Sequence, residues 1–417
     1  MVQFAKRNVD RIYQDILYLS SPDLSGRLSG TVWARKAAAF LAESLLQAGL
    51  SPSGEREYFS SVNVPAAQLV GPAHLKIGDH VLQHRIDFSE MSPYSSGGIC
   101  KGPLVTVRDG DDLSPDQLAG KIVVIPELPP DFDLGSTIQS AADLGVAALL
   151  IESGEPNWFH KTVFGSIQSR IPVIRLRRSI AKAVVDHPGL KVHLELPLEI
   201  NVLACQNVMG FLPGINQNRT LLLCAHYDHL GDDPDGLRFP GTIDNASGVA
   251  VILEVARLLA KREYALPFNV LVAFLTGEES GLWGSKQFAS NPPMPLTAVV
   301  NLDCLGFETE LHALRIGHQA SGDWLTELAS SVIKNHGVDV RWLAGGDDSV
   351  AFIQKGIPTI GLGQKPTLPE STSIHTVNDS PDNLHLKPIE KGYAIVCDLV
   401  NKLVDSPHFW DQENKNI

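Results

Sequence analysis

Apolar and polar positions follow two different periods along this chain. Over residues 7–20 and 31–48 the apolar side chains recur every three to four positions, which predicts two amphipathic helices. From about residue 62 to residue 198, short runs of β-type residues dominate, such as 121–125 and 147–151. Loops rich in Pro, Gly and Asp separate these runs. This middle region is therefore predicted to be rich in strands.

From Asn201 onward, apolar runs of strand type alternate with helical stretches. Helices are expected at about 246–262, 281–290, 321–336, 348–355 and 387–404. Such alternation is typical of a mostly parallel sheet with helices on both of its faces. The two N-terminal helices have no sheet of their own, so we expect them to pack on this later domain. The predicted division is therefore 1–61 together with 199–417, with 62–198 as an insertion.

Composition and charge exclude several classes of protein. The chain has 417 residues, of which 44% are hydrophobic and 19% charged, as in ordinary globular proteins. A formal net charge of -13 and the lack of a basic run argue against a nucleic-acid partner. No apolar stretch reaches the roughly 18 residues needed to span a membrane. Asp10 and Arg11 lie where a signal peptide needs its apolar core, so we expect a cytoplasmic protein, although an exported mature form stays open.

Three apolar runs in the C-terminal region lead into acidic or imidazole side chains. The first leads into His226, the second into Glu278 and Glu279, and the third into Asp303. In open α/β sheets, ligands gather beyond the carboxyl ends of the strands. The sequence has no nucleophile elbow, phosphate-binding loop, dinucleotide fingerprint or His-Glu-x-x-His motif. A His with several carboxylates therefore predicts a site for a divalent metal.

Further candidate residues lie in loops. Asp244 is part of Gly-Thr-Ile-Asp-Asn-Ala-Ser-Gly, directly before a predicted helix. It can be a helix cap, or its two oxygens can each bind a metal, and the spacing does not separate these interpretations. Asp228 follows His226 by two residues and can hold that ring in one tautomer. His375 lies in the loop before the last helix.

The adjacent acids Glu278 and Glu279 would repel each other in a crevice without a cation or a shared proton. Adjacent residues point in different directions, so one can bind metal while the other accepts a proton from water. A solvated pair at the start of a helix is the alternative. His229, the acidic turn at 109–112 and the acid-rich segment 232–236 are all expected to face solvent.

The chain resembles the co-catalytic zinc aminopeptidases of metallopeptidase family 28 over residues 201–405. The resemblance rests on Ala-His226-Tyr-Asp228-His, Gly-Thr-Ile-Asp244-Asn-Ala-Ser-Gly, Glu278-Glu279-Ser-Gly-Leu-Trp-Gly-Ser, Asn-Leu-Asp303 and His375-Thr-x-x-Asp379. The insertion is similar, less specifically, to the protease-associated domain of many members, in the segments 120–125 and 141–151. The resemblance implies a mixed, mostly parallel α/β sheet sandwiched by helices, as in zinc peptidases. It makes 199–417 the catalytic domain, 1–61 its N-terminal helices, and 62–198 the inserted β-rich protease-associated domain.

The resemblance also implies a set of roles. Two Zn²⁺ ions would be bound per chain, with Asp244 bridging them. Glu279 and His375 would complete one zinc site, and His226 and Asp303 the other. Glu278 would be the general base acting with the zinc-activated water, while Asp228 would orient His226. The Asp244–Asn245 peptide bond would be cis, and the substrates would be peptides with a free N-terminus.

In one stretch the chain departs from the family pattern. Some members place a Tyr shortly before a Ser-Asp-His motif, but residues 343–349 contain no Tyr, and Ser349 stands in place of the His. The residue that stabilises the oxyanion, and the preferred N-terminal residue, are therefore unassigned. A carboxypeptidase or dipeptidase would need a cationic pocket, for which the sequence offers Arg238, Lys286, Arg315 and Lys365. A binding protein without activity is the third alternative, although every expected ligand is present. Manganese or cobalt could replace zinc, and the sequence does not indicate the oligomeric state.

Overall fold

The computed structural model describes residues 6–108, 115–129, 131–165, 169–187, 189–317, 323–343, 346–366, 373–406 and 408. The acidic turn at 109–112 and residues 344–345 of the stretch expected to hold an oxyanion donor lie outside these ranges. The chain forms two compact units. The first unit comprises Met1–Val64, Leu203–Asp232 and Arg238–Ile417, and the second comprises Pro65–Val202 and Asp233–Leu237.

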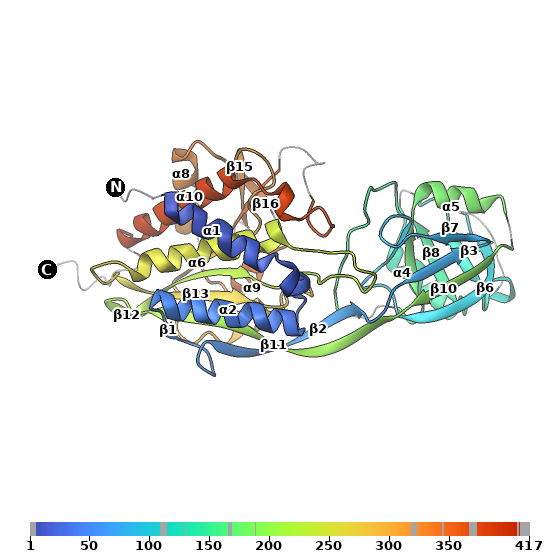
Figure 1. The fold of residues 1–417 in the computed structure, drawn as a ribbon, viewed down its shortest axis with the longest axis horizontal. Coiled ribbons are helices and arrows are strands. Elements are labelled where there is room, and N and C mark those ends of the chain that lie inside the picture. Colours follow the sequence, from blue (N-terminus) through green and yellow to red (C-terminus); the bar gives the residue numbers. More distant parts are fainter. Residues whose placement is uncertain are drawn as a thin grey trace. The chain divides into compact units, whose positions relative to one another are not determined.

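A nine-stranded sheet is the centre of the first unit (Figure 1). Its strands are β1 (Ser51–Pro52), β2 (Phe59–Leu69), β11 (Leu198–Leu212), β12 (Asn216–His226), β13 (Phe268–Leu275), β14 (Ala298–Leu302), β15 (Ala313–Gly317), β16 (Asp339–Leu343) and β17 (Thr359–Gln364). They are ordered β1-β11-β13-β12-β14-β17-β15-β16, with β2 paired to β11. The central strands β13, β12, β14 and β17 run parallel, whereas β11 and β15 pair antiparallel with β13 and β17. The predicted mixed, mostly parallel sheet is confirmed.

Helices cover both faces of this sheet. One face packs against α1 (Lys6–Leu19), α2 (Val32–Ala48), α6 (Ser247–Ala260), α8 (Asp323–Asn335) and α10 (Leu386–Val404), and the other against α7 (Trp283–Ser290) and α9 (Ser349–Ile353). Strand β12 shows how the sequence achieves this: Leu221, Leu223 and Ala225 join the first core, while Leu222 and Cys224 join the second. Successive residues of a strand point to opposite faces. A strand buried on both faces is therefore apolar at every position.

The helix predictions agree with these bounds to within a few residues. In α2, the Thr31 side chain accepts a hydrogen bond from the Ala34 amide and begins the helix, while Gly49 ends it with φ 92°. Among the described residues, no helix is both long enough and apolar enough to cross a membrane.

The second unit has its own eight-stranded sheet. Its strands are β3 (His74–Ile77), β4 (His80–Leu82), β5 (Phe88–Glu90), β6 (Gly98–Thr106), β7 (Ile122–Ile125), β8 (Ala148–Glu152), β9 (Val173–Leu176) and β10 (Lys191–Leu196). They are ordered β4-β3-β10-β6-β7-β8-β9-β5, and β6 to β9 run parallel. Helices α3 (Pro115–Leu118), α4 (Leu134–Asp143) and α5 (Arg178–Val185) complete the unit. The unit is rich in strands, as predicted.

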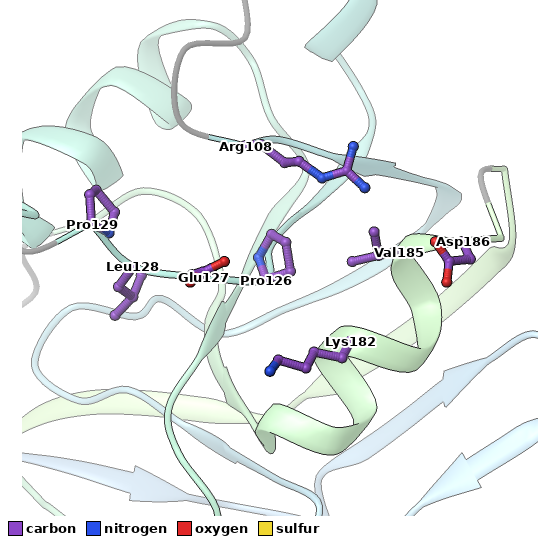
Figure 2. A pocket seen from close by; sticks show the side chains of 8 residues that line it. All are labelled: Arg108, Pro126, Glu127, Leu128, Pro129, Lys182, Val185 and Asp186. Carbon is purple, nitrogen blue, oxygen red and sulfur yellow. The ribbon is translucent and has the colours of Figure 1, made fainter.

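A cavity of about 510 Å³ opens where β6 and β7 end (Figure 2). Its charged lining residues are Arg108, Glu127, Lys182 and Asp186, and all four are exposed. Acids and bases are therefore mixed in the lining of this cavity, and these side chains are open to solvent.

Candidate metal centre

His226 is the last residue of β12, and its side chain is only 1% exposed. Its Nδ1 lies 3.2 Å from the backbone carbonyl oxygen of Asp228 and 3.8 Å from Oδ1 of the same residue. The carbonyl is therefore the nearer acceptor, while the Asp228 carboxylate accepts hydrogen bonds from the Ser29 hydroxyl and the Glu278 amide. Holding one ring nitrogen in this way leaves Nε2 to face the site.

Asp303 follows β14, the strand next to β12. Oδ2 of Asp303 accepts a hydrogen bond of 2.7 Å from Arg315, and its Oδ1 lies 3.5 Å from Nε2 of His226. Burial alone raises the pKa of the Asp303 carboxyl, but the charges of Arg315 and His226 outweigh it and lower the pKa to about 2. Asp303 is therefore ionised at neutral pH.

Asp244 lies in the turn Thr242–Ala246 at the start of α6. The carboxylate of Asp379 fixes this turn, because its two oxygens accept hydrogen bonds from the backbone amides of Ile243 (2.6 Å) and Asp244 (3.1 Å). The side chain of Asn245 donates to the Leu302 carbonyl and accepts from the Cys304 amide, which ties the turn to the end of β14. The Asp244–Asn245 peptide bond is cis, which confirms the prediction.

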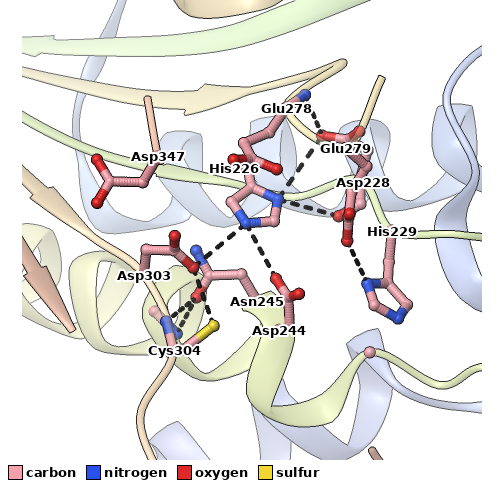
Figure 3. Close-up of polar contacts among 12 residues, drawn as sticks. His226, Asp228, His229, Asp244, Asn245, Glu278, Glu279, Asp303, Cys304 and Asp347 are labelled. Carbon is pink, nitrogen blue, oxygen red and sulfur yellow. Dashed lines mark hydrogen bonds and ion pairs between the residues drawn. The ribbon is translucent and has the colours of Figure 1, made fainter. Parts of the chain in front are cut away.

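The carboxylate of Asp244 faces two sets of side chains, one with each oxygen. Oδ1 lies 3.2 Å from Nε2 of His226 (Figure 3), and Oδ2 lies 3.1 Å from Nε2 of His375. The same nitrogen of His375 lies 3.1 Å from Oε2 of Glu279. The structure thus brings together all five side chains that the sequence proposed as ligands, with Asp244 between the two pairs.

His229 is not at the surface, and that expectation is wrong. Its ring is fully buried, and its Nδ1 lies 2.7 Å from Oε1 of Glu279. Gly241 leaves room for the ring: a Cβ added there would lie 2.5 Å from the imidazole Cγ. His229 therefore contacts one oxygen of Glu279 while His375 contacts the other. Its closeness in sequence to His226, directly after a strand, was the available signal.

Glu278 is half-buried, and its carboxyl group lies among like charges. Burial raises its pKa, and Glu279 and Asp303 add to this, so that the pKa lies well above its usual range despite the attraction of His226. An oxygen of Glu278 also lies within 4.8 Å of ligand atoms of His226 and Asp303. A raised pKa and this closeness suit a carboxylate that accepts and returns a proton.

Asp348 was not among the predicted site residues, yet it is fully buried. Neither of its carboxylate oxygens forms a hydrogen bond within the described part of the chain. Burial, with the charges of Asp228 and Asp347, raises its pKa to about 7, although His226 opposes this. Nothing in its sequence context distinguishes Asp348 from a solvated loop acid, because its burial depends on contacts between distant elements.

The chemistry of the donor atoms fits a divalent cation. Two buried ring nitrogens, Nε2 of His226 and Nε2 of His229, lack hydrogen bonds to any residue that the structure describes. Atoms of His226, Glu278 and Asp303 lie within 4.8 Å of one another, as do those of His229, Asp244 and Glu279. Imidazole nitrogen and carboxylate oxygen are ligands of zinc. Buried carboxylates in this number would repel one another without a positive charge between them.

Residues 207–400 match the sequence profile of peptidase family M28. The chain carries a domain of that family. The matched range begins within β11 and contains the five proposed ligands together with Asp228, His229, Glu278 and Asp348. The family resemblance recognised in the sequence is confirmed.

Curated relatives of the chain are similar in part or in full. Over 176 residues it is 32% identical to a "probable zinc metalloprotease" of Pyrenophora teres f. teres (strain 0-1), covering 39% of this chain and 35% of the relative. The chain thus spans about a third of the length of that relative. Over 411 residues it is 25% identical to the aminopeptidase YwaD of Bacillus subtilis (strain 168), covering 94% of this chain and 84% of the relative.

Solved structures share the whole fold. The zinc aminopeptidase BSAP of Bacillus subtilis superimposes with a TM-score of 0.72 at 20% sequence identity, covering 95% of each chain. At this identity the similarity shows the fold, while the function has to be argued from the site.

Proposed function

We propose that this protein is a zinc-dependent aminopeptidase that removes N-terminal residues from peptides. The observation that carries the proposal is the position of Asp244, whose two oxygens face His226 on one side and His375 on the other. This arrangement suits two zinc ions. His226, Asp303 and Asp244 would hold one ion, and Asp244, Glu279 and His375 the other. The names of the relatives, a zinc metalloprotease and an aminopeptidase, support both the metal and the reaction.

When bound, zinc would supply Lewis acidity toward a carbonyl oxygen and would ease the deprotonation of water. The remaining steps belong to side chains of the protein. The oxygen of a water molecule attacks the carbonyl carbon of the first peptide bond, and Glu278 accepts the proton that this water loses. The C–N bond then breaks, and Glu278 returns the proton to the leaving amine. Asp228 holds the Glu278 amide at 3.3 Å and so fixes the backbone from which this base projects.

The basic residues near the site favour a free N-terminus over a C-terminal carboxylate as the substrate end, because those that could bind a carboxylate already have acidic partners. Of the basic residues that a carboxypeptidase could use, Arg315 is already bound to Asp303 and lies 3.6 Å from Asp347. Arg238 pairs with Asp232.

The second unit supports a separate proposal about domains. Its strand β7 and the α4–β8 unit correspond to the segments 120–125 and 141–151 in which the insertion resembles a protease-associated domain. The unit also has its own two hydrophobic cores. We therefore propose that Pro65–Val202 is an inserted domain of this type.

Peptide cleavage by the zinc-loaded protein tests the function. A short peptide should lose its first residue, its N-acetylated form should stay intact, and native mass spectrometry should find two zinc ions per chain. Glu278→Gln should lower kcat by about 10²- to 10⁴-fold, because it removes the general base. The matched control is Glu310→Gln, since Glu310 is an exposed glutamate of the same unit that pairs with Lys387. Cleavage of the acetylated peptide from its C-terminus would contradict the proposal.

A further inference from the structure

Arg27 is completely buried although it ends a short 3-10 helix (Pro22–Arg27) in a stretch rich in Ser, Gly and Pro residues. Its guanidinium group donates four hydrogen bonds, and each acceptor is a backbone carbonyl oxygen. The acceptors are the carbonyls of Leu19, Tyr227 (2.8 Å), Pro240 (2.8 Å) and Gly241 (2.8 Å). A planar group with several donors in a fixed arrangement can bind several carbonyls at once, which a single ammonium group cannot do in the same way.

Three of the four acceptors of Arg27 lie at the two ends of one segment. Tyr227 directly follows His226, and Gly241 precedes the turn that contains Asp244. The segment between them is long and has no helix or strand of its own. A segment of this kind has many conformations in which His226 and Asp244 are far apart. By binding both of its ends, Arg27 removes those conformations.

The backbone around Arg27 strengthens this contact. The amide of His229 donates to the Arg27 carbonyl (3.4 Å), and the amide of Gly231 donates to the Gly26 carbonyl (2.9 Å). A Cβ at Gly26 would lie 2.5 Å from the Phe239 carbonyl oxygen and 2.8 Å from Cα of Gly231. Glycine is therefore needed beside Arg27 for the two backbones to approach this closely.

The charge of Arg27 acts in the same place. Burial lowers its pKa to about 10, while Asp379, Asp244, Asp228 and Glu279 oppose that decrease. The guanidinium group is thus still positive at neutral pH and lies near four carboxylates of the candidate centre. Its positive charge partly offsets their repulsion before any metal is bound.

We propose that Arg27 is the positioning residue of the metal centre: it binds both ends of the segment Tyr227–Gly241 and so holds His226 and Asp244 face to face. This inference rests on the proposed function, because it takes these two residues to be zinc ligands. Because the guanidinium group of Arg27 donates to backbone carbonyls, the proposal assigns it no contact with metal or substrate. A substitution of Arg27 is expected to change the affinity for zinc. It should change kcat and KM only because less zinc is bound.

Zinc affinity of three variants tests the role of Arg27. Arg27→Met should weaken zinc binding by about 10- to 100-fold, the usual loss when a residue that supports metal ligands is removed. The matched control is Arg257→Met. Arg257 is also largely buried in the first unit, with 14% of its side chain exposed, but it pairs with Asp15 and Glu254. That control should lower the unfolding temperature and leave zinc affinity unchanged. Affinity is measured by competition with a chromophoric chelator.

The conservative variant separates charge from geometry. Arg27→Lys keeps the charge but has no planar fork, so most of the loss in zinc affinity should persist. Full recovery of the affinity in Arg27→Lys would overturn the proposal. So would a folded Arg27→Met with the zinc affinity of the unaltered protein, or an equal loss in Arg257→Met. At saturating zinc, kcat and KM of Arg27→Lys should return to those of the unaltered enzyme.

A measurement on the unaltered protein covers the case in which these variants do not fold. If Arg27 arranges the segment in advance, the amides of His229, Gly231 and Ala246 should be protected from hydrogen exchange without zinc, because their backbone bonds already exist. Rapid exchange at these amides in metal-free protein would overturn the proposal. If the unaltered protein binds zinc but cleaves no peptide, the proposed function fails while the inference about Arg27 stands.

Discussion

Two fully buried arginines, one in each unit, have partners of opposite kinds. Arg85 of the second unit binds both oxygens of Asp233 (2.7 and 3.1 Å) and one oxygen of Glu90 (2.7 Å). Lys161 lies 2.7 Å from Asp233 as well, so that two cations face two anions. Arg27 of the first unit donates its four hydrogen bonds to backbone carbonyl oxygens. None of these hydrogen bonds goes to the carboxylates near it.

This difference separates a structural cluster from a functional one. The cluster of the second unit, formed by Arg85, Glu90, Lys161 and Asp233, is balanced in charge and hydrogen-bonded, so it requires no ligand. The centre of the first unit has more carboxylates than cations and has buried ring nitrogens without hydrogen bonds. Buried charge alone is therefore a poor sign of function. An excess of buried carboxylates, together with buried ring nitrogens that form no hydrogen bond, is a better sign of a functional site.

Breaking the balanced cluster should have the largest effect on stability. Arg85→Met leaves Glu90 and Asp233 buried with one cation fewer, which should destabilise the second unit by about 3–5 kcal/mol. Hydrogen exchange followed by mass spectrometry can read the unfolding free energy from amides of β7 and β8. The first unit should keep its zinc affinity.

An exposed arginine of the same unit is the control for Arg85. Arg170 pairs with Asp143 at the surface, with 75% of its side chain exposed. Arg170→Met should change the stability of the second unit by less than about 1 kcal/mol, because exposed ion pairs contribute little. Equal effects of the two substitutions would show that the cluster around Arg85 is not a structural centre.

Removing zinc should have the next largest effect, and only in the first unit. Zinc at 100 times its dissociation constant should stabilise that unit by about 2.7 kcal/mol, which a chelator would abolish. The amides of α6 and β12 should lose this protection, and those of β7 and β8 should not. An equal loss of protection in both units would contradict the proposal that the first unit needs a metal ion and the second does not.

A last comparison distinguishes Asp348 of the first unit from Glu90 of the second by the sign of their contributions to the pH dependence of stability. In the folded, metal-free protein the pKa of Asp348 is raised to about 7, mainly by burial. The folded state therefore loses stability as pH rises from about 4, near the unfolded pKa, to about 7. Asp348→Asn removes this dependence, so its stability relative to the unaltered protein should increase as pH rises through that window.

Glu90 should respond in the opposite direction. Burial raises its pKa, but Arg85 and His84 outweigh this and lower it far below the usual range. The contribution of Glu90 to stability is therefore present above its unfolded pKa and is lost as pH falls. Urea unfolding of zinc-free protein, read by hydrogen exchange across this pH range, measures both units at once. The same slope for Asp348→Asn and the unaltered protein would refute the assignment to Asp348.

The parts of the fold that repeat a local pattern could be predicted from the sequence. The strand ends that hold His226, Glu278 and Asp303 were found because apolar runs, and the polar residues that follow them, are local signals. The apolar residues on both faces of β12 and the Thr31 cap of α2 are local signals in the same sense. In each of these cases a few neighbouring residues determine the structure.

The residues that were missed depend on contacts between distant segments. No sequence pattern indicates that Arg27 is buried, because its burial results from the approach of residues near 230 and 240. Asp233 was expected in a solvated segment, and this is wrong: its side chain is buried against Arg85 and Lys161. Asp348 is a polar loop residue whose neighbours in sequence give no indication of what covers it, and for His229 the only local signal is its closeness to His226. Sequence patterns reflect interactions between residues that are close in sequence. The burial of these side chains depends instead on residues that are distant in sequence.

The short segment Asp233–Leu237 means that the second unit cannot be exchanged as a simple cassette. The chain passes between the units at 64/65, 202/203, 232/233 and 237/238, so a gene fusion joining residue 64 to residue 203 removes Arg85 and Lys161 and leaves Asp233 behind. That fusion would keep the acid of an ion cluster and lose both of its cations. A domain swap between relatives therefore has to transfer five residues from outside the insertion. In evolution, changes at Arg85 and Asp233 are expected to be inherited together, although the two positions lie in separate parts of the gene.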